Sequence, residues 1–563
     1  MKGKQLFAKK IAESTVGVLT EDEVLKKIEF SKYQEQGDLA FPCFELAKVY
    51  KKNPASIATE LATKIKSSYF CKVVSEGPYV NCFLNKKRVS MEVLADIQTK
   101  KETYGSLSKG QGEKVTIDFS SPNIAKPFSM GHLRSTVIGN AYANILEKCG
   151  YKAIRINHLG DWGTQFGKLI SAYHRWGNEQ VVRKDPIKEL LKLYIRFHEE
   201  AEMDSRLEEE GRLWFRKLEQ GDKKALELWQ WFREVSLEEF KGIYKLLNVT
   251  FDSYNGEAFY NDKMEETIQL LKREGLLSTS QGAEVVPLEE HNLPPCLIQK
   301  SDGATLYATR DLTAAIYRHK KYQFAKSVYV VGQEQSLHFQ QIFLVLRKLG
   351  FNWASQLEHL PFGFILQNGK KMSTRKGKVV LLENVLREAI AMAEKSIEEK
   401  NPTLQNKSKV AHDVGIGAII FQDLKTDPQH SVEFSLEAML RFEGATGPYV
   451  QYTHARACSI LRKSNCYKGS ESLDGLSDEP SWSVVKKLMD FPSKVQESYE
   501  QAKPSEIATY LLSLCREFNK YYAHCKILHE DNKLASRLAL VECTAIVIKE
   551  GLRLLGMQAP SEM

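Results

Sequence analysis

The sequence predicts an α/β protein of several domains, with a parallel sheet at its centre and a C-terminal part made only of helices. Three observations support this fold class. The chain has 563 residues, whereas a single hydrophobic core stops growing at about 250 to 300 residues. A strand, a helix and a second strand follow one another from Val115 to about Gly160, and a strand and helix return from Lys326. Beyond about Arg441 the pattern is helical apart from one polar loop.

Residues 1–108 are expected to form a separate α+β domain. Helical patterns accompany one clear turn and strand signal here, EGPYVNCFLN. The polar segment KETYGSLSKGQGEK that follows is typical of a linker. We therefore place the first domain boundary near residue 108.

Residues 109–382 are expected to form the central α/β domain. In VTIDF, Val115 to Phe119, apolar and polar residues alternate as in a strand. The segment GHLRSTVIGNAYANILEKCG has apolar residues at helical spacing and ends on Gly150, a common stop for a helix. KAIRINHLG is then a second strand. Such a unit has parallel strands joined by a right-handed crossover.

An insertion at about residues 180–300 separates the two halves of this domain. Its pattern is helical and rich in charge, and it begins with Asp185 and Pro186, which are typical of a helix start. The α/β pattern returns at KSVYVVG, Lys326 to Gly332. After this domain we expect a connecting helical region at 383–440 and a helical domain at 441–563.

Composition narrows the class of protein. Hydrophobic residues at 43% and charged residues at 27% exclude a disordered or fibrous chain. A net charge of +8 permits an acidic partner but does not require one. The ten cysteines show no metal-ligand spacing, so we expect reduced thiols and no protein-held metal. Without a signal-peptide core or a membrane-spanning stretch, we expect a cytoplasmic protein with no membrane contact. We also expect a monomer.

The loop from Ser120 to His132 lies where a strand becomes a helix. Backbone amides near Gly131 would therefore sit at a helix N-terminus, which favours anions such as phosphate. The His132 side chain could donate a hydrogen bond to phosphate oxygens. Taken alone, a Gly-His pair at a helix start is more often structural.

The string SSPNIAKPFSMGHLRS, Ser120 to Ser135, resembles the H-x-G-H signature of class I aminoacyl-tRNA synthetases, as found in the arginyl enzymes. Ser129 stands where that signature has its first histidine, so a hydroxyl that carries no charge replaces an imidazole. KMSTR, Lys371 to Arg375, is similar to the second signature, K-M-S-K-S. The cations around it suit a departing pyrophosphate; the alternative is a solvated basic loop.

The resemblance implies a Rossmann-type catalytic domain with a helical insertion, an N-terminal additional domain that contacts the tRNA D-loop, and a C-terminal anticodon-binding domain. It also implies a set of groups around ATP, with Mg²⁺ neutralising further phosphate charge. The residues expected to stabilise phosphate charge during catalysis are His132, Ser129, Lys126 and Lys371. Those expected to bind ATP are Ser129, Gly131, His132, His338, Lys371, Met372 and Ser373.

Specificity for arginine is expected from TLYATRDLTAAIYR. Tyr307 and Asp311 are four residues apart, so they face the same way on a helix. A carboxylate can take a guanidinium through two hydrogen bonds, and the resemblance gives these two residues that role; the alternative is a helix with a solvated Asp. The full set expected around arginine is Ser121, Asn123, His132, Tyr307, Asp311 and Gln335. In HLGDWGTQFGKLI we expect Asp161, Trp162 and Gln165 to shape the floor of the site.

Contacts with tRNA are expected at both ends of the chain. Tyr79 and Asn81 in EGPYVNCFLN match positions where the family contacts a D-loop base, although a buried Tyr on a strand is an equal alternative. Tyr449, Tyr452 and Arg456 in GATGPYVQYTHARACSILR are the candidates in the helical domain. Acidic and basic residues nearly balance after Gly444, so we expect specific stacking rather than a broad basic face to hold RNA.

The resemblance implies an arginyl-tRNA synthetase. Such an enzyme uses ATP to convert L-arginine to arginyl adenylate, and then transfers arginine to the 3′-terminal adenosine of tRNA(Arg). Two alternatives stay open at this point. One is a non-catalytic tRNA-binding paralogue, which the intact His132, Lys371, Tyr307 and Asp311 argue against. The other is another nucleotidyl transferase of the same fold, which would need neither end domain.

Overall fold

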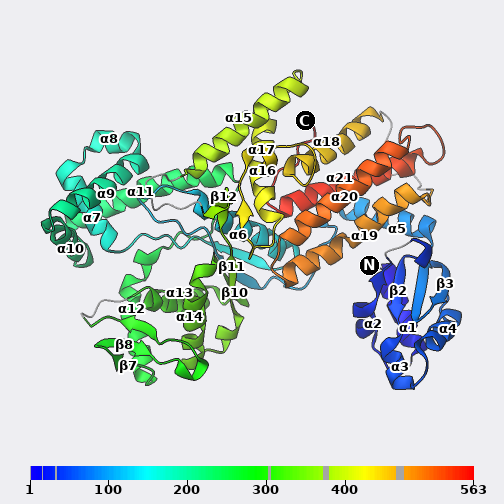
Figure 1. Ribbon diagram of the computed structural model, residues 1–563, viewed down its shortest axis with the longest axis horizontal. Helices are drawn as coiled ribbons and strands as arrows, with labels where there is room; N and C mark the ends of the chain where they lie inside the picture. Colours follow the sequence, from blue (N-terminus) through cyan, green and yellow to red (C-terminus); the bar gives the residue numbers. More distant parts are fainter. Residues whose placement is uncertain (1, 16, 32–33, 302–305, 372–379, 465–473) are drawn as a thin grey trace.

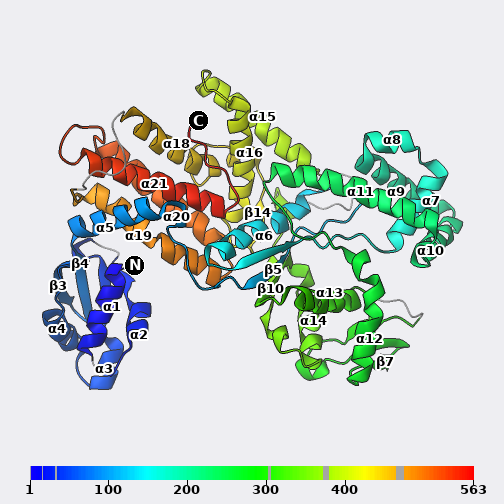
Figure 2. The same ribbon diagram turned by 180° about the vertical axis from the view of Figure 1, so that it is seen from behind.

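A computed structural model describes residues 2–15, 17–31, 34–301, 306–371, 380–464 and 474–563. The chain forms an elongated molecule with the N-terminal domain and the helical insertion at opposite ends (Figures 1 and 2). The catalytic sheet lies between them, and the helices of the C-terminal part lie on the side of the N-terminal domain.

The N-terminal domain is built on a four-stranded antiparallel sheet with the order β1-β2-β4-β3. Helix α5 leads out of this domain and contacts α19 and α21 of the C-terminal part. The elements are α1 Lys2–Ser14, α2 Glu21–Lys27, β1 Glu29–Phe30, β2 Leu39–Pro42, α3 Phe44–Tyr50, α4 Pro54–Lys64, β3 Phe70–Glu76, β4 Tyr79–Leu84 and α5 Lys86–Lys100.

The catalytic sheet is parallel, with the order β11-β10-β5-β6. The two central strands are β5 and β10. The connection after β5 leads to β6 at one edge of the sheet, and the connection after β10 leads to β11 at the other edge. Loops at the carboxyl ends of such a central pair form the usual ligand crevice of an open α/β sheet. The elements are β5 Lys114–Asp118, α6 Met130–Lys148, β6 Lys152–Ile156, α13 Tyr307–Tyr322, β10 Lys326–Gly332, α14 Ser336–Lys348 and β11 Leu357–Phe362.

The insertion is helical only in its first part. The helices are α7 Thr164–Trp176, α8 Glu179–Lys184, α9 Pro186–Met203, α10 Arg206–Glu219, α11 Lys223–Leu246 and α12 Met264–Arg273. A three-stranded antiparallel sheet follows, formed by β7 Ser278–Ser280, β8 Ala283–Val286 and β9 Cys296–Gln299. The expected helical character up to about residue 300 is therefore wrong for this last segment. Strands of three or four residues are too short to show an alternating pattern.

A second small sheet lies after the catalytic domain. Its strands are β12 Ile365–Gln367, β13 Lys370–Lys371 and β14 Val432–Glu433, with the order β13-β12-β14. The helices nearby are α15 Leu382–Lys400, α16 Lys407–Leu424 and α17 Leu436–Met439. Strand β14 pairs in parallel with β12. The end of the region 383–440, which was expected to be helical, therefore contains a strand and lies beside the strand just before Lys371.

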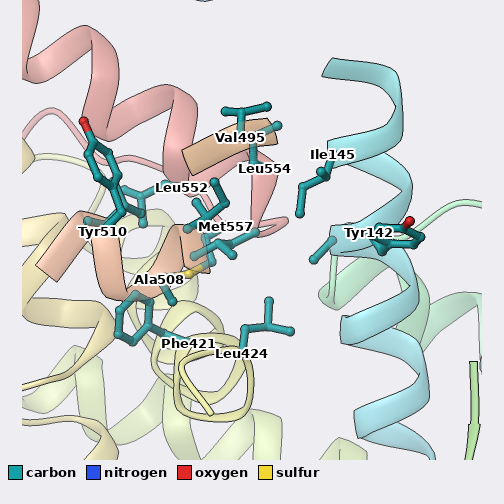
Figure 3. Close-up of a cluster of buried hydrophobic side chains, with 14 of the residues drawn as sticks. Tyr142, Ile145, Phe421, Leu424, Val495, Ala508, Tyr510, Leu552, Leu554 and Met557 are labelled. Atoms are coloured by element: carbon teal, nitrogen blue, oxygen red, sulfur yellow. The ribbon is translucent and has the colours of Figure 1, made fainter. Parts of the chain in front are cut away.

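The C-terminal helices share one hydrophobic core with the catalytic domain. They are α18 Gly447–Lys463, α19 Glu479–Glu500, α20 Ser505–His524 and α21 Leu534–Leu554. Figure 3 shows Tyr142 and Ile145 of α6 opposite a cluster of apolar side chains from α16 and the C-terminal helices. At the end of α6, Lys148 forms a buried ion pair of 2.8 Å with Glu550 of α21. Helix α6 is thus packed against this helical part along much of its length.

None of the helices in the described part of the chain has both the length and the apolar character needed to cross a membrane.

Candidate active site and RNA-binding surfaces

The loop after β5 is held in a strained conformation. Ser120, Ser121 and Ala125 have positive φ angles of 73°, 47° and 56°, and left-handed backbone costs a non-glycine residue about 1 to 2 kcal/mol. The loop is fixed from two sides: Ser120 N–H donates to Ser135 Oγ of α6 at 2.8 Å, and Ala125 N–H donates to Ser236 Oγ of α11 at 2.9 Å. Strain maintained in this way is typical of functional loops.

His132 is held as a neutral ring at the start of α6. The backbone N–H of Ser129 donates to Nδ1 of His132 at 3.1 Å. Burial lowers the pKa of His132 to about 4, against the opposing effect of that hydrogen bond. Since Nδ1 is the acceptor, the single proton of the neutral ring lies on Nε2. His132 therefore presents an N–H donor, as a phosphate ligand requires.

Ser129 is turned toward the same ring. Its side chain is buried, and its Oγ lies 3.3 Å from Nδ1 of His132. Ser129 also precedes the first residue of α6 and forms a capping box with His132. In this arrangement Ser129 orients the His132 ring.

The two signature segments are joined by backbone hydrogen bonds although they lie far apart in the sequence. Met130 N–H donates to Val380 O at 3.2 Å, and Leu382 N–H donates to Phe128 O at 3.0 Å. Ser129 and Leu381 form an antiparallel bridge between these two bonds. The chain that follows the second signature is therefore attached directly to the residues that precede His132.

The two lysines expected near phosphate differ in their surroundings. Lys126 lies 5.6 Å from the ring centre of Tyr194 in the insertion, and burial lowers its pKa. In the part of the chain that the structure describes, no carboxylate pairs with Lys126. Lys371 pairs with Glu334 at 2.8 Å and is about half exposed. Met372 and Ser373, expected to bind ATP, lie outside the described residues.

Asp311 lies in a polar network at the carboxyl end of the sheet. His338 Nε2 is 2.6 Å from Asp311 Oδ2, and His158 Nε2 is 4.0 Å from Oδ1. Burial opposes ionisation of Asp311, but the hydrogen bond and charge of His338, with help from His158 and Arg318, bring its pKa below the usual value. The carboxylate is therefore ionised and partly exposed. His338, expected on the ATP side, therefore contacts a residue that is expected to bind arginine.

The same network ties Asp311 to the loop after β5. Arg318 of α13 forms a buried ion pair of 2.8 Å with Asp118 at the end of β5, and its NH2 group lies 3.3 Å from His158 Nδ1. Ser121 Oγ in turn donates to Asp118 Oδ1 at 3.0 Å. The structure thus connects Ser121 and Asp311, two residues expected around arginine, through buried charges.

The other side chains expected around arginine, those of Tyr307, Asn123 and Gln335, are exposed. Tyr307 is the first residue of α13 and is 66% exposed. Asn123 is exposed and pairs with Gly160, where an added Cβ would come within 1.9 Å of Asn123 Oδ1. Gln335 is exposed at the end of the short 3₁₀ helix Gln333–Gln335. These three side chains are accessible to a ligand.

The sequence interpretation missed Glu257. It begins the 3₁₀ helix Glu257–Lys263, and burial raises the pKa of its carboxyl to about 7 against the opposing charge of Arg310, which lies 3.8 Å away. The charges of Asp161 and Asp311 raise it further. Glu257 therefore lies close enough to Asp161 and Asp311 for their charges to act on it. No motif surrounds it, and only its position in the fold reveals it.

Asp161 has a structural role beneath this site. It is almost fully buried, accepts from Arg233 of α11 at 2.9 Å, and accepts from Ala258 N–H at 2.9 Å. Trp229 Nε1 also donates to the backbone oxygen of Asp161 at 2.7 Å. Asp161 therefore fixes both α11 and the residue next to Glu257. The part of this segment in the floor of the site stays a prediction.

The C-terminal helical domain contains a cavity of about 1060 Å³. Arg456 lies between two tyrosine rings, 4.9 Å from Tyr452 and 5.1 Å from Tyr522. Tyr449 does not line the cavity; its hydroxyl accepts from Asn519 at 3.1 Å. The lining includes basic groups that sequence reasoning did not single out, namely Arg462, Lys463, Lys526 and His529.

In the N-terminal domain, the two expected RNA contacts differ in accessibility. Tyr79 is half-buried at the start of β4. Asn81 is 3% exposed, and its Nδ2 donates to Glu76 Oε2 at 3.0 Å. The tyrosine faces solvent in part, whereas the amide does not.

Comparison with protein families covers nearly the whole chain. Residues 93–436 match the class I (R) tRNA synthetase catalytic domain, residues 450–563 match the DALR anticodon binding domain, and residues 2–84 match the arginyl-tRNA synthetase N-terminal domain. The chain belongs to the class I arginyl-tRNA synthetases.

Individual arginyl-tRNA synthetases match over full length. Arginine-tRNA ligase 2 of Bacillus anthracis is 58% identical over 560 residues, and arginine-tRNA ligase of Enterococcus faecalis is 57% identical over 563 residues, with 100% of both chains covered in each case. The solved Thermus thermophilus arginyl-tRNA synthetase has a TM-score of 0.82 and 25% identity, covering 100% of this chain and 99% of its own. The Plasmodium falciparum structure has a TM-score of 0.83 and 26% identity, covering 100% and 98%.

These findings confirm the family, the ligase class and the fold class that the signature strings predicted. The class I arginyl-tRNA synthetase fold also accounts for ATP as a substrate. The role of each site residue and the domain boundaries stay predictions.

Proposed function

We propose that the chain activates L-arginine with ATP and transfers it to the 3′-terminal adenosine of tRNA(Arg). An oxygen of the arginine carboxylate attacks the α-phosphorus in line, the bond to the β-phosphate oxygen breaks, and arginyl adenylate and pyrophosphate form. The tRNA hydroxyl then attacks the arginyl carbonyl and AMP leaves. Most of the catalysis is positioning and stabilisation of charge.

The observation that carries the proposal is the attachment of residues 380–382 to residues 128–130. It brings the chain that follows the second signature to the start of α6, where His132 lies in the first turn. The Nε2–H donor of His132 and the ammonium groups of Lys126 and Lys371 are the charge-stabilising groups for the phosphates. Ser129 acts by orienting His132.

Arginine is assigned to the crevice between α13 and the loop after β5. Asp311 and Glu257 would take the guanidinium, since a planar cation with five N–H donors suits two carboxylates. Tyr307 would cover it, while Ser121, Asn123 and Gln335 hold the amino and carboxylate end. Binding of a cation would draw Glu257 into its ionised form.

Mg²⁺ is assigned to this site as a companion of ATP. Among the described residues no group of three or more His, Cys, Asp or Glu side chains could hold a metal ion, and Mg²⁺ commonly binds through substrate phosphates with few protein ligands. When bound, it neutralises phosphate charge. Mg²⁺ dependence of pyrophosphate exchange tests this assignment.

For tRNA, Tyr452, Arg456 and Tyr522 would take unstacked anticodon-loop bases in the 1060 Å³ cavity. Tyr79 would contact the D-loop, while Asn81 and Tyr449 support neighbouring groups from beneath. Because all these sites lie on one chain, we infer that it acts as a monomer. We also infer that it acts in the cytoplasm, where charged tRNA is used.

The test is ATP-dependent attachment of each amino acid to total tRNA, with pyrophosphate exchange measured with and without tRNA. We expect arginine alone to be attached. Attachment of another amino acid would refute the specificity, and tRNA binding without adenylate formation would favour a non-catalytic paralogue. Point substitutions are the right controls, because removal of the helical domain would expose the core that it shares with α6 (Figure 3).

A further inference from the structure

An exposed aromatic pair lies on the N-terminal domain. Phe44, the first residue of α3, is 48% exposed. Its ring lies edge-on to Tyr79, with 5.8 Å between ring centroids and an interplanar angle of 89°. Two aromatic rings from separate elements therefore form one continuous surface on this domain.

The backbone holds these two rings together. Cys43 N–H donates to Pro78 O at 2.9 Å, and Phe44 and Tyr79 are the next residues along each segment. Pro42 is also paired with Tyr79 in the sheet. Cys43 is fully buried and anchors the start of α3. The Phe44 ring is thus positioned before any ligand arrives, which lowers the entropy cost of binding.

A free cation lies beside this pair. Lys48 is four residues after Phe44 on α3, so the two side chains project from the same side of the helix, and Lys48 is exposed. In the described parts of the chain no carboxylate pairs with it. The acid nearest in sequence, Glu45, is paired with Lys27, and Lys52 is paired with Glu60. Lys48 is therefore available to an anion.

Aromatic faces beside unpaired cations are typical of surfaces that bind single-stranded nucleic acid. An apolar protein partner would not require the cation. The expected partner of Tyr79 in RNA binding, Asn81, is buried and bound to Glu76. Phe44 is the ring that the structure places next to Tyr79 at the surface.

We propose that Phe44 and Lys48 extend Tyr79 into an RNA-binding surface for the unpaired nucleotides of a tRNA loop. Phe44 stacks on one base, and Lys48 contacts a neighbouring phosphate. The inference rests on the proposed function in that tRNA is the substrate, and it adds α3 to the contacts.

The experiment uses the full-length chain with Phe44→Ala and Lys48→Ala. Phe30→Ala is the matched aromatic control, since Phe30 is 40% exposed in the same domain. Lys52→Ala is the matched lysine control because Lys52 already has a partner. The measurements are KM and kcat for tRNA at two salt concentrations, and KM for arginine and ATP.

Phe44→Ala should raise the KM for tRNA about fivefold to hundredfold, the range expected for one lost stacking contact, and leave kcat and the other KM values unchanged. Phe44→Trp should keep the wild-type KM. Lys48→Ala should raise the KM for tRNA. It should also lower the slope of log KM against log salt concentration by about one, the change expected when one phosphate contact is lost. Both controls should resemble wild type.

The inference would be overturned if Phe44→Ala and Phe30→Ala had equal KM values for tRNA. It would also be overturned if Phe44→Ala raised the KM values for arginine and ATP as much as the KM for tRNA. If Phe44→Ala abolished capture of a protein while the KM for tRNA stayed unchanged, the surface would be a protein-binding one and the inference would also fail. Failure of the proposed function would look different, because wild type itself would then charge no tRNA.

Discussion

The Nε2 atom of His338 lies 2.6 Å from Oδ2 of Asp311, and this contact spans the two halves of the candidate active site. It holds an ionised carboxylate in a partly buried position, and the pKa of Asp311 is lowered although burial opposes this. The charge of Asp311 also acts on Glu257, whose pKa is raised to about 7, mainly by burial. Under the proposed assignment, a guanidinium would meet one carboxylate that is already ionised and one that ionises on binding.

We expect Asp311→Ala to impair arginine use strongly while ATP binding survives. Loss of one partner from a buried charged pair costs about 2 to 5 kcal/mol, so kcat/KM for arginine should fall roughly thirtyfold to several thousandfold. Pyrophosphate exchange at varied arginine measures this, and Asp262→Ala, an exposed acid nearby, is the control. Unchanged arginine kinetics in the Asp311 variant would remove the pocket assignment.

The raised pKa of Glu257 predicts a pH dependence of arginine binding. The cation needs the ionised carboxylate, and Glu257 is protonated below about pH 7. The KM for arginine should therefore rise as pH falls from 8 to 6, by as much as about tenfold per pH unit. Glu257→Gln should raise the KM at pH 8 and flatten the profile. A variant that keeps the wild-type slope would show that another group titrates.

The same raised pKa has a consequence for stability that serves as a control. The folded pKa lies above the ordinary value of 4.5, so ionisation of Glu257 destabilises the fold as pH rises between those two values. Glu257→Gln should then melt at a higher temperature than wild type at pH 8 and at the same temperature at pH 5. Equal melting temperatures at both pH values would contradict the raised pKa.

His132→Ala should lower the rate of adenylate formation about a hundredfold to a thousandfold, since one fixed donor to developing charge is lost. Ser129→Ala should cost much less, because the main-chain N–H of residue 129, not its hydroxyl, holds Nδ1 of His132 at 3.1 Å. With the pKa of His132 near 4, its ring stays neutral, and rates between pH 6 and 9 should show no titration of this residue. Single-turnover measurements with ATP and arginine check all three expectations.

The outline of the fold could be predicted because its signals are local. The alternation in Val115 to Phe119 and the helical spacing before Gly150 depend only on neighbouring residues, and both match elements of the structure. The strands β7, β8 and β9 were missed because each has too few residues to show a period. The pairing of β14 with β12 joins residues far apart in sequence, which no local pattern reveals.

The residues of the candidate site also differ in whether the sequence could predict them. Asp311 belongs to a string that resembles the family, whereas Glu257 has no motif. Its raised pKa comes from burial and from the nearby charges of Asp161 and Asp311.

The charge distribution of the helical domain also could not be predicted from the order of its residues. Acidic and basic residues nearly balance along the sequence after Gly444, but folding brings Arg456, Arg462, Lys463, Lys526 and His529 around one cavity. Local charge density is a property of the fold.

Arg537 determines the shape of one wall of that cavity. Its guanidinium on α21 donates from Nε to Ile527 O at 2.9 Å, donates from NH2 to His529 O, and pairs with Asp531 at 2.9 Å. Residues 525–529 line the cavity and contain no regular helix or strand. One partly buried cation thus fixes a segment that has little secondary structure of its own.

We expect Arg537→Ala to raise the KM for tRNA at least tenfold, with kcat and the KM for arginine unchanged. If Arg537 acts by shaping the anticodon cavity, the loss should be much smaller for a tRNA whose anticodon bases have been replaced, since that contact is already missing. A loss of general stability would instead lower charging of both tRNAs equally. Lys533→Ala, just before α21, is the control. An equal rise in KM for both tRNAs, without a change in melting temperature, would show that Arg537 does not act through the anticodon cavity.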